Sequence, residues 1–331
     1  MALTVELGVA ELAATRFAIS PLSETVSCLQ QLGDRDRSAI NLRWLRWAVD
    51  ELAADPLDLS FVWPLLVSDR PNWPEFLVPA PLGAGASIED DLAALRRTTA
   101  RQVRTSLRRV FGEELTGTVA ELAADPAAGL RAIADQLRAT HDRLIAPHWP
   151  RIRAVLDADV AYRAKQLALG GAEQLFTGLH PDLRWSGNRL RLEGTRWRSE
   201  LAVKRGPGGL VLIPVAVGSP YVLIKKSTST QTTVRYPARG VGALWTAGTR
   251  APSGSAVRLL GRVRAGLLEA LRSPATTTDL ARALGVTPSA VSQHLGVLRE
   301  SGLVARERSG RTVLYLTTAL GASLLGTASV G

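Results

Sequence analysis

The chain has 331 residues, 46% of them hydrophobic, and a net charge of +10, and this length predicts two or three domains instead of one small core. A single cysteine, Cys28, excludes an intrachain disulfide and is typical of a protein in a reducing cytoplasm. No run of about 18 uncharged apolar residues is present, and the first residues lack the basic start of a secretory signal, so we expect no membrane span and no export.

Residues 1–180 predict a mainly helical region. Ser20 and Asp125 each precede a proline, and this pair of residue types is a typical helix start, because the side-chain oxygen accepts a free backbone N–H and proline needs no partner at the first helical position. Residues 61–81 contain five prolines, which disrupt regular hydrogen bonding, so we expect an extended segment there.

Four arginines fall on one stripe of the helix predicted around residue 102, opposite an apolar side. We favour a solvated face whose arginines pair with scattered acids, and binding of phosphates or of an acidic ligand stays open as the alternative. The four residues are Arg97, Arg101, Arg104 and Arg108.

Residues 185–240 differ from the preceding region and predict short strands separated by glycine and proline. A helical region followed by a small antiparallel sheet is therefore expected in the N-terminal domain, and an α+β fold in the multidomain chain as a whole. The runs with strand character lie at residues 190–192, 201–203, 210–217, 221–224 and 232–236.

A domain boundary is predicted in residues 240–255, which are rich in glycine, proline and serine. All eight tryptophans precede residue 246, so the two sides of this segment differ in composition. We expect an N-terminal domain over residues 1–240 with its β region at 185–240, a linker over 241–255, and a C-terminal domain over 256–325. One helix from Ala256 to about Leu271 is expected to open the C-terminal domain.

Residues 276–316 predict two helices joined by a tight turn and followed by a hairpin. Thr276 and Asp279 have the spacing of a capping box, and Gly285 supplies the turn after the first helix. Thr287 and Pro288 then start the second helix as N-cap and first helical residue.

The second of these helices has an apolar stripe at Val291, Leu295 and Leu298, which predicts its buried side. Ser289, Ser292 and Gln293 are therefore expected to point outward, and small polar side chains of this kind suit the edges of DNA bases. Two strands, 303–308 and 311–316, are predicted to pair across the turn at Ser309-Gly310.

The segment DLARALGVTPSAVSQHLGVLRESGLV, with the basic hairpin that ends in VLYLT, resembles the winged helix-turn-helix domain of ArsR-type bacterial transcriptional regulators. The resemblance covers roughly residues 256–320 and implies a recognition helix, a DNA-contacting wing and a homodimer. The upstream stretches RFAISPLSE, WPEFLVPAP and HWPRIRAVLDADVAYRAKQLALGGAEQLFTGLHP resemble a domain found ahead of such winged helices. That second resemblance implies architecture and transfers no activity.

The charge distribution also favours nucleic acid as the partner. Residues 256–331 contain nine arginines and four acidic residues, so this small part carries half of the net charge. Excess positive charge on a compact domain is typical of phosphate binding. We predict that double-stranded DNA is contacted by Thr287, Ser289, Ser292, Gln293, His294, Arg299, Arg306, Arg308 and Arg311.

Motifs of catalysis and cofactor binding are missing from the sequence. There is no P-loop, dinucleotide-binding glycine pattern, GxSxG or HExxH motif, so we expect no enzyme, no catalytic residues and no cofactor. Metal-sensing ArsR-type proteins carry cysteines in the DNA-binding unit or acidic and histidine ligands in the last helix, and both sets are absent here. His141, His148 and Asp142 are a weak ligand set, so we expect no metal site.

We therefore predict a sequence-specific DNA-binding transcriptional regulator that acts as a homodimeric repressor in the cytoplasm, associated with the nucleoid. A non-metal signal is expected to enter through the N-terminal domain, which would provide dimerisation, a site for a small-molecule effector, or both. Two alternatives stay open: an enzyme in residues 1–240 tethered to a DNA-binding module, and a winged helix that binds proteins instead of DNA.

Overall fold

The chain forms two compact units in a computed structural model. The larger unit comprises Met1–Arg37 and Glu51–Arg239, and the smaller unit comprises Ser38–Asp50 and Gly240–Gly331. The predicted multidomain α+β fold class is confirmed. The structure describes residues 2–33, 41–68, 72–81, 83, 85–193, 201–202, 208–225, 231–245, 254–271, 275–284, 286–309 and 312–325.

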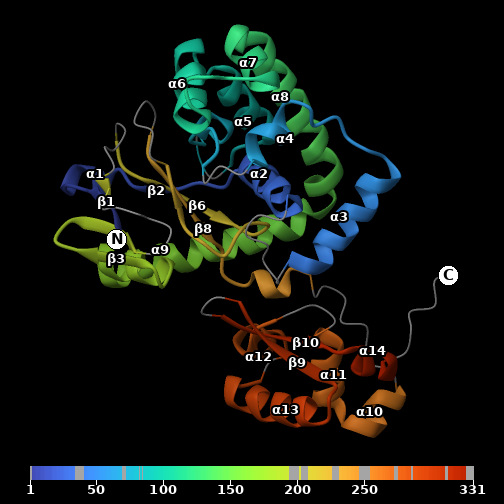
Figure 1. Cartoon of the computed structure of the whole chain (residues 1–331). Helices are drawn as coiled ribbons and strands as arrows, with labels where there is room; N and C mark the ends of the chain where they lie inside the picture. The colour runs from blue at the N-terminus through green and yellow to red at the C-terminus, as the bar shows by residue number, and fades with distance from the viewer. Residues whose placement is uncertain are drawn as a thin grey trace. The chain divides into compact units, whose positions relative to one another are not determined.

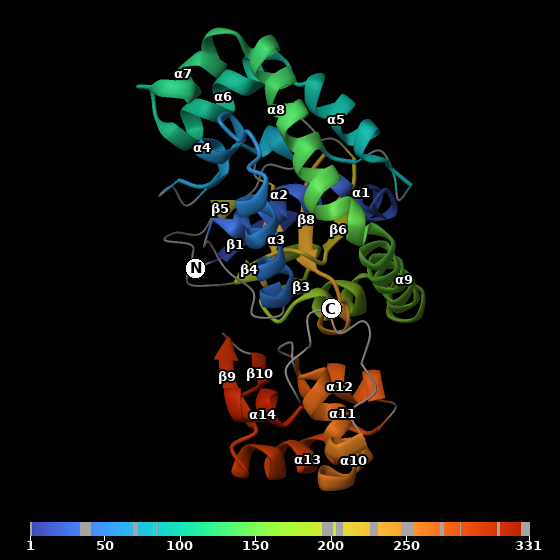
Figure 2. The same cartoon turned by 90° about the vertical axis from the view of Figure 1, so that its right-hand side faces the viewer.

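Helix α2 (Pro21–Leu32) lies at the centre of the larger unit. Ten of its residues are buried, so it has no solvent-facing side and behaves as a core helix. Ser20 begins it as predicted, because its hydroxyl accepts a hydrogen bond from the Ser23 amide at 2.9 Å. Helices α4 to α8 gather at one end of this unit, away from the strands (Figures 1 and 2). The remaining helices are α1 (Val9–Ala13), α4 (Val62–Leu66), η2 (Glu75–Leu77), α5 (Ile88–Arg96), α6 (Ala100–Phe111), α7 (Gly117–Ala124), α8 (Pro126–Thr140), η3 (His141–Ile145), η4 (Ala146–His148) and α9 (Trp149–Leu179).

The extended segment expected at residues 61–81 is wrong in part, because α4 and η2 form inside it. Pro64 is the third residue of α4, in the first turn of a helix, where backbone N–H groups have no intrahelical partner. A proline therefore costs the helix no hydrogen bond there. Burial of Leu65 and Leu66 then stabilises this short helix.

The first sheet of the larger unit has the strand order β3-β4-β1-β5. Strand β1 pairs antiparallel with β4, with Leu3 opposite Leu192, and parallel with β5, with Leu3 opposite Leu201. The start of the chain thus lies between strands from the β region predicted at 185–240. Its strands are β1 (Ala2–Glu6), β3 (Leu183–Ser186), β4 (Arg189–Glu193) and β5 (Leu201–Ala202).

The second sheet has the order β2-β6-β8-β7. Strand β6 is parallel to both β2 and β8, and every one of its residues is buried, as expected of a strand inside a parallel sheet. Strand β7 is antiparallel to β8. Antiparallel pairs are present as predicted, and the parallel pairs arise because the chain returns to the sheet through longer connections. The strands are β2 (Arg16–Phe17), β6 (Val211–Val215), β7 (Leu223–Ile224) and β8 (Thr233–Pro237).

The smaller unit is a helical group with a two-stranded hairpin. A single hydrophobic cluster joins its helices and includes Leu268, Leu280, Leu295 and Leu298, none more than 1% exposed. Its elements are η5 (Val241–Ala243), α10 (Gly254–Leu260), α11 (Arg262–Ala270), α12 (Thr277–Leu284), α13 (Pro288–Glu300), β9 (Val304–Ser309), β10 (Thr312–Thr317) and α14 (Ala319–Leu324).

The single helix expected from Ala256 is wrong, because two helices, α10 and α11, occupy that stretch. They are separated by Gly261, whose φ of 79° lies in the region that favours glycine. The apolar periodicity continues across the break, and this continuity led to the prediction of one helix. A consequence is that Val263 is 37% exposed instead of contributing fully to the inner stripe.

The smaller unit includes a segment from the first sixth of the chain. Trp44, near the start of α3 (Leu42–Ala54), packs against Trp245 with ring centroids 6.2 Å apart. Trp245 also donates its indole N–H to Asn41 at 2.8 Å, and Arg43 donates to the Trp245 carbonyl at 3.1 Å. Trp44 and Trp245, at most 6% exposed, thus form a buried contact in this unit, outside the hydrophobic cluster of residues 256–325.

Candidate nucleic-acid interface

The first helix of the predicted helix-turn-helix, α12, has the local structure that its sequence indicates. The Asp279 amide donates to the Thr276 hydroxyl at 3.2 Å, and that hydroxyl donates to the Asp279 carboxylate at 2.7 Å. These bonds satisfy backbone and side-chain groups at the helix start. Leu280 and Ala281 are buried beneath it. The turn predicted at Gly285 lies outside the described residues.

The second helix, α13, is fixed by its cap and by its inner side. Thr287 accepts a hydrogen bond from the Ala290 amide at 3.3 Å, which confirms its predicted role as N-cap. Val291, Leu295 and Leu298 are at most 1% exposed, so the predicted buried stripe is confirmed. Their burial determines which side of α13 faces the solvent.

The outer side of α13 carries most of the predicted DNA contacts. Ser289, Ser292, Gln293 and Arg299 are exposed, as is the capping residue Thr287. His294 is half-buried at the border between the apolar stripe and this outer side. The structure thus brings these six residues together on one helix and its cap. Thr287, Ser289, Ser292 and Gln293 have uncharged polar side chains, which can approach base edges closely.

Strands β9 and β10 form the predicted wing. Arg306 lies opposite Tyr315 in the register and its side chain is exposed. Arg308 lies opposite Val313, closer to the turn, while its side chain and the whole of Arg311 are outside the described residues. Ala275 exchanges two backbone hydrogen bonds of 3.0 Å with Tyr315, which attach the hairpin to the segment before α12.

The arrangement can bind a nucleic-acid duplex. A helix with one buried stripe presents a polar outer side, its N-terminal amides favour anionic groups, and an arginine-bearing hairpin lies in the same unit. Within the described part of the chain, no group of three or more histidine, cysteine, aspartate or glutamate side chains converges on a possible metal position. No helix in the described part is long and apolar enough to cross a membrane.

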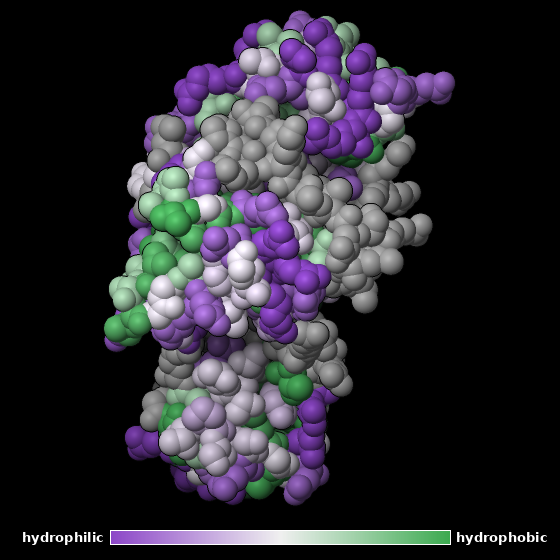
Figure 3. Space-filling view, turned by 90° about the vertical axis from the view of Figure 1, so that its left-hand side faces the viewer, coloured by the Kyte–Doolittle hydropathy of each residue, from purple (hydrophilic) through white to green (hydrophobic). Residues whose placement is uncertain are grey.

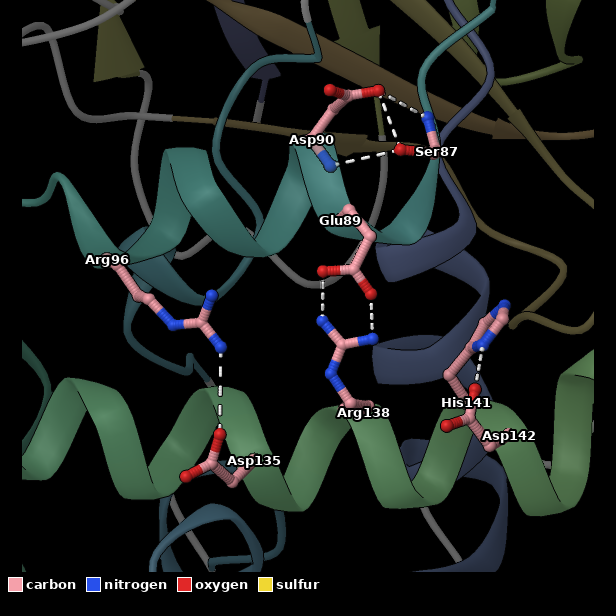
Figure 4. A network of polar contacts seen from close by, with 8 residues as sticks. All are labelled: Ser87, Glu89, Asp90, Arg96, Asp135, Arg138, His141 and Asp142. Atoms are coloured by element: carbon pink, nitrogen blue, oxygen red, sulfur yellow. Dashed lines mark hydrogen bonds and ion pairs between the residues drawn. The ribbon is translucent and has the colours of Figure 1, made fainter.

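Polar contacts in the larger unit serve mainly to join its helices. Glu89 of α5 pairs with Arg138 of α8 through both carboxylate oxygens (Figure 4). About two turns further along α5, Arg96 pairs with Asp135 of α8 at 3.6 Å. Ion pairs between partly exposed side chains contribute little stability each, but they fix the register of the two helices.

The histidines considered as metal ligands have other contacts. His141 Nδ1 lies 3.0 Å from Asp142 Oδ1 (Figure 4), and its ring meets Trp149 edge-on at 6.4 Å between centroids. Burial and the neighbouring Arg151 lower the pKa of His148. These contacts hold the irregular turns η3 and η4 between α8 and α9.

The arginine stripe of α6 also has structural partners. Arg104 donates to the carbonyls of Ala123 at 2.8 Å and Ala124 at 3.4 Å, where α7 ends. Arg108 lies 3.4 Å from Glu113. A cation at a helix C-terminus stabilises its unpaired carbonyls. The Arg108–Glu113 pair agrees with the favoured interpretation of an acid-paired face. The predicted stripe of four on one helix is wrong for Arg97, which caps the end of α5 and lies outside α6.

The larger unit contains buried ionisable groups that sequence reasoning missed. The Glu24 carboxylate accepts hydrogen bonds from the amides of Ala216 and Val217, both at 2.7 Å. Burial raises its pKa to about 7, against the lowering effect of those amides and of Arg235. Burial likewise raises the pKa of Asp91 to about 6. Because α2 is buried on all sides, its sequence carries no periodic signal that marks Glu24.

A third buried carboxylate, Asp159 in α9, joins this helix to strand β8. It accepts the Tyr236 hydroxyl at 2.8 Å and the Arg239 amide at 3.0 Å, and Arg163 lies 3.5 Å away. Burial, the charge of Asp159 and this hydrogen bond raise the pKa of Tyr236 well above its usual value. These partners give Asp159 a structural role, which is to attach α9 to β8 and to the residues that follow it.

Exposed apolar residues are present on the larger unit as well. Figure 3 shows hydrophobic residues gathered along one edge of its surface, between hydrophilic ones. Among the described residues of this unit, the most exposed large apolar side chains include Val9 at 81% and Leu169 at 71%. Exposed apolar atoms are common on protein surfaces, so we assign these residues no role.

Two protein families match parts of the chain. Residues 259–307 match a helix-turn-helix domain family, and residues 84–242 match a family of unknown function (DUF5937). The predicted resemblance of the C-terminal region to ArsR-type helix-turn-helix domains, behind an uncharacterised N-terminal domain, is confirmed.

A curated relative supports the same placement. The chain is 50% identical over 50 residues to the HTH-type transcriptional regulator NmtR of Mycobacterium tuberculosis. The match covers 15% of this chain and 42% of NmtR, so it spans less than half of the relative. No solved structure matches the chain.

Proposed function

We propose that this protein is a sequence-specific DNA-binding transcriptional regulator. The observation that carries the proposal is the outer side of α13, where Ser289, Ser292 and Gln293 are exposed opposite a fully buried apolar stripe. A helix held this way enters a major groove with its N-terminal half toward the bases. The relative NmtR is named as an HTH-type transcriptional regulator, and residues 259–307 match a helix-turn-helix domain family.

Specificity would come from the polar side chains of α13. Gln293 can make two hydrogen bonds to adenine, and the serines can bond to several bases. The start of α13 suits a phosphate through the Ser289 amide, since Pro288 has no amide hydrogen and the Ala290 amide is bonded to Thr287. His294, half-buried on the same helix, would contact the same backbone from the edge of the interface.

The arginines would set affinity. Arg299 at the C-terminal end of α13 and Arg306 on the wing are exposed, and each can neutralise a phosphate. Arg308 and Arg311 near the hairpin turn stay predictions from the sequence. Binding through phosphates would favour DNA in general, and the α13 contacts would select the operator.

The Arg306→Ala substitution is expected to weaken binding to all DNA sequences by a similar factor and to reduce the salt dependence of the binding constant by about one ion. The measurement is fluorescence anisotropy with a duplex from the protein's own upstream region, at several salt concentrations. Arg131→Ala, which removes an exposed arginine of the larger unit, is the matched control. If the salt dependence of the binding constant is the same for Arg306→Ala as for the wild type, Arg306 does not contact a phosphate.

The upstream duplex itself tests the main proposal. The wild-type protein should bind it with strong salt dependence and more tightly than an unrelated duplex of the same length. Absence of a salt-sensitive preference for any fragment of that region would contradict the proposed function.

We infer that the regulator acts as a homodimeric repressor on an inverted repeat. One recognition helix reads few base pairs, and two half-sites about one helical turn apart extend the sequence that is read. The smaller unit exposes Leu259 of α10 at 69% and Leu320 of α14 at 59%, outside the α13 surface. Apolar side chains at these places suit a self-complementary contact between two copies.

The substitutions Leu259→Asp and Leu320→Asp, made separately, are expected to raise the dissociation constant of the dimer at least about tenfold, because each places a charge in an apolar contact. Sedimentation equilibrium gives this constant directly. Val9→Asp, at an exposed valine of the larger unit, serves as the control. A wild-type monomer, or two variants that associate like the wild type, would contradict the dimer contact.

The location of the protein and the signal that controls its DNA binding follow from the proposed regulatory function. We place the protein in the cytoplasm with the nucleoid, because its proposed partner is chromosomal DNA. The signal would be a non-metal small molecule acting through the larger unit, and we assign no catalytic role to either unit.

A further inference from the structure

The outer side of α13 carries two residues that the proposed DNA contacts do not include. Gly296 follows Ser292, and Val297 follows Gln293, by four positions, so the four residues form one continuous patch on the helix surface. Helix α13 runs along an outer edge of the smaller unit in both views (Figures 1 and 2). Gly296 and Val297 therefore adjoin the side chains that are proposed to read bases.

Gly296 weakens α13 without a compensating contact in the described part of the chain. Glycine inside a helix is destabilising, because it loses the most backbone freedom on folding. Gly296 lies more than one turn from either end of α13, and its φ is not positive, so the backbone does not require glycine. A Cβ atom at this position would have open space, with no described atom of another element within 4 Å. Packing within the described residues thus gives no reason for glycine here.

Val297 is an apolar side chain in this polar patch. It is 40% exposed, whereas the three residues of the buried stripe of α13 are at most 1% exposed. Among the described residues, the hydrophobic cluster of the smaller unit does not include it. In the major groove the matching apolar group is the methyl group of thymine, and the partner of a glutamine side chain is adenine. Val297, one turn after Gln293, therefore suits a thymine methyl group.

The geometry of the major groove connects the two residues. The groove is about 12 Å wide and a helix with its side chains is about 10–12 Å across, so the depth of entry depends on the side chains that face the bases. A glycine on the inserted face lets the helix backbone approach its partner closely. Close approach at Gly296 would bring the short side chains of Ser292 and Val297 within reach of base edges.

We propose that Gly296 lets α13 enter the major groove closely and that Val297 contacts a thymine methyl group beside the base read by Gln293. This inference rests on the proposed function and adds a feature of the operator, which is a thymine recognised by apolar contact. It also explains why α13 has a glycine where its own packing does not need one.

Gly296→Ala distinguishes a DNA contact from a structural role, because two measured quantities should move in opposite directions. The melting temperature of the smaller unit should rise by at least about 2 °C, since alanine is the better helix former and its methyl group has open space. The affinity for the operator should fall at least about fivefold, because the methyl group occupies the space of close approach. Scanning calorimetry and fluorescence anisotropy with the upstream duplex measure these quantities.

Gly266→Ala is the matched control inside α11, where a Cβ atom would make an ordinary contact of 3.5 Å with Leu284. It should raise the melting temperature in the same way and leave the operator affinity unchanged. A lower melting temperature for Gly296→Ala would show that this glycine serves the fold. Unchanged operator affinity would show that DNA does not approach Gly296 closely. Either result overturns the proposed close approach.

Uracil replacement tests the contact of Val297. Uracil lacks only the C5 methyl group of thymine, so operator duplexes are prepared with each thymine replaced in turn. At one position the wild type should lose about fourfold in affinity, as expected for one buried methyl group, and Val297→Ala should lose less than about twofold there. Val49→Ala, at a valine of α3 that is 48% exposed, is the control and should behave as the wild type. Equal losses for wild type and Val297→Ala at every thymine would overturn the methyl contact.

These outcomes differ from a failure of the proposed function. If the wild type prefers no upstream fragment, the proposed function fails and the groove contact fails with it. If the wild type binds the operator and the Ser292→Ala, Gln293→Ala double variant binds it weakly, the proposed function stands. Operator binding by Gly296→Ala and Val297→Ala that matches the wild type would then overturn only the close approach and the methyl contact.

Discussion

The double substitution Ser292→Ala and Gln293→Ala is expected to lower the affinity for the operator at least about 30-fold, since each lost base contact costs roughly 1–3 kcal/mol. Affinity for unrelated DNA should stay the same, because phosphates dominate that binding. Specificity should therefore collapse while general binding persists. Anisotropy titrations with operator and unrelated duplexes measure both quantities.

This substitution separates recognition from folding. Both side chains are exposed and outside the core, so the thermal stability of the variant should match that of the wild type. Thr105→Ala, at an exposed position of α6 in the larger unit, controls for loss of a surface hydroxyl. If operator and unrelated DNA weaken together, or neither weakens, α13 does not read bases through these residues.

The second large effect is a loss of folding stability with rising pH, caused by Glu24. Its pKa is about 7 in the folded chain and about 4.5 when unfolded, so the folded state holds this proton more tightly. Stability from this group is full below pH 4.5 and is lost as pH rises toward 7. Over pH 5–7 the loss is on the order of 2 kcal/mol. Asp91, whose folded pKa is about 6, acts in the same direction.

Other groups around Glu24 decide how the experiment is designed. Arg235 faces it from β8, and the neighbouring Cys28 thiol has a pKa raised by burial and by Glu24, so neither titrates between pH 5 and 7. His148 has a lowered pKa, and its contribution to stability therefore increases with pH. The difference in the free energy of unfolding between the wild type and Glu24→Gln, taken at each pH, does not contain the contribution of His148.

Glu24→Gln should flatten the pH dependence, because glutamine resembles the protonated side chain and does not titrate. Calorimetric unfolding at pH 5 and pH 7 gives the change for wild type and variant, and Asp91→Asn provides an independent second case. A wild-type transition that gains stability from pH 5 to 7 by the same amount as Glu24→Gln would show that Glu24 ionises normally.

Local chemistry made the helix-turn-helix predictable. The Thr276 capping box, the Thr287 cap and the spacing of Val291, Leu295 and Leu298 each depend on residues within a few positions of one another. Such patterns determine helix ends and inner faces before any tertiary contact is known. Because Val291, Leu295 and Leu298 face the core, the remaining residues of α13 could be predicted to face the solvent.

Long-range contacts explain what was missed. Leu3 pairs with Leu192, and Arg235 reaches Ser27, so neither the placement of β1 nor the contacts of Arg235 follow from neighbouring residues. Gly261 separates two helices whose apolar period runs on unbroken. The burial of Glu24 depends on amides 192 and 193 positions away, which no local pattern marks.

The Arg43–Trp245 bond, which spans 202 positions, sets an order of events in synthesis. The segment around Trp44 leaves the ribosome early, and its partners in the smaller unit follow only after nearly all of the larger unit has been made. Contacts of such sequence separation form slowly, because much chain must be ordered first. The contact of α3 with Trp245 therefore forms only after the larger unit has been made, whereas the described core of the helix-turn-helix comes from residues 256–325, which are made together at the end.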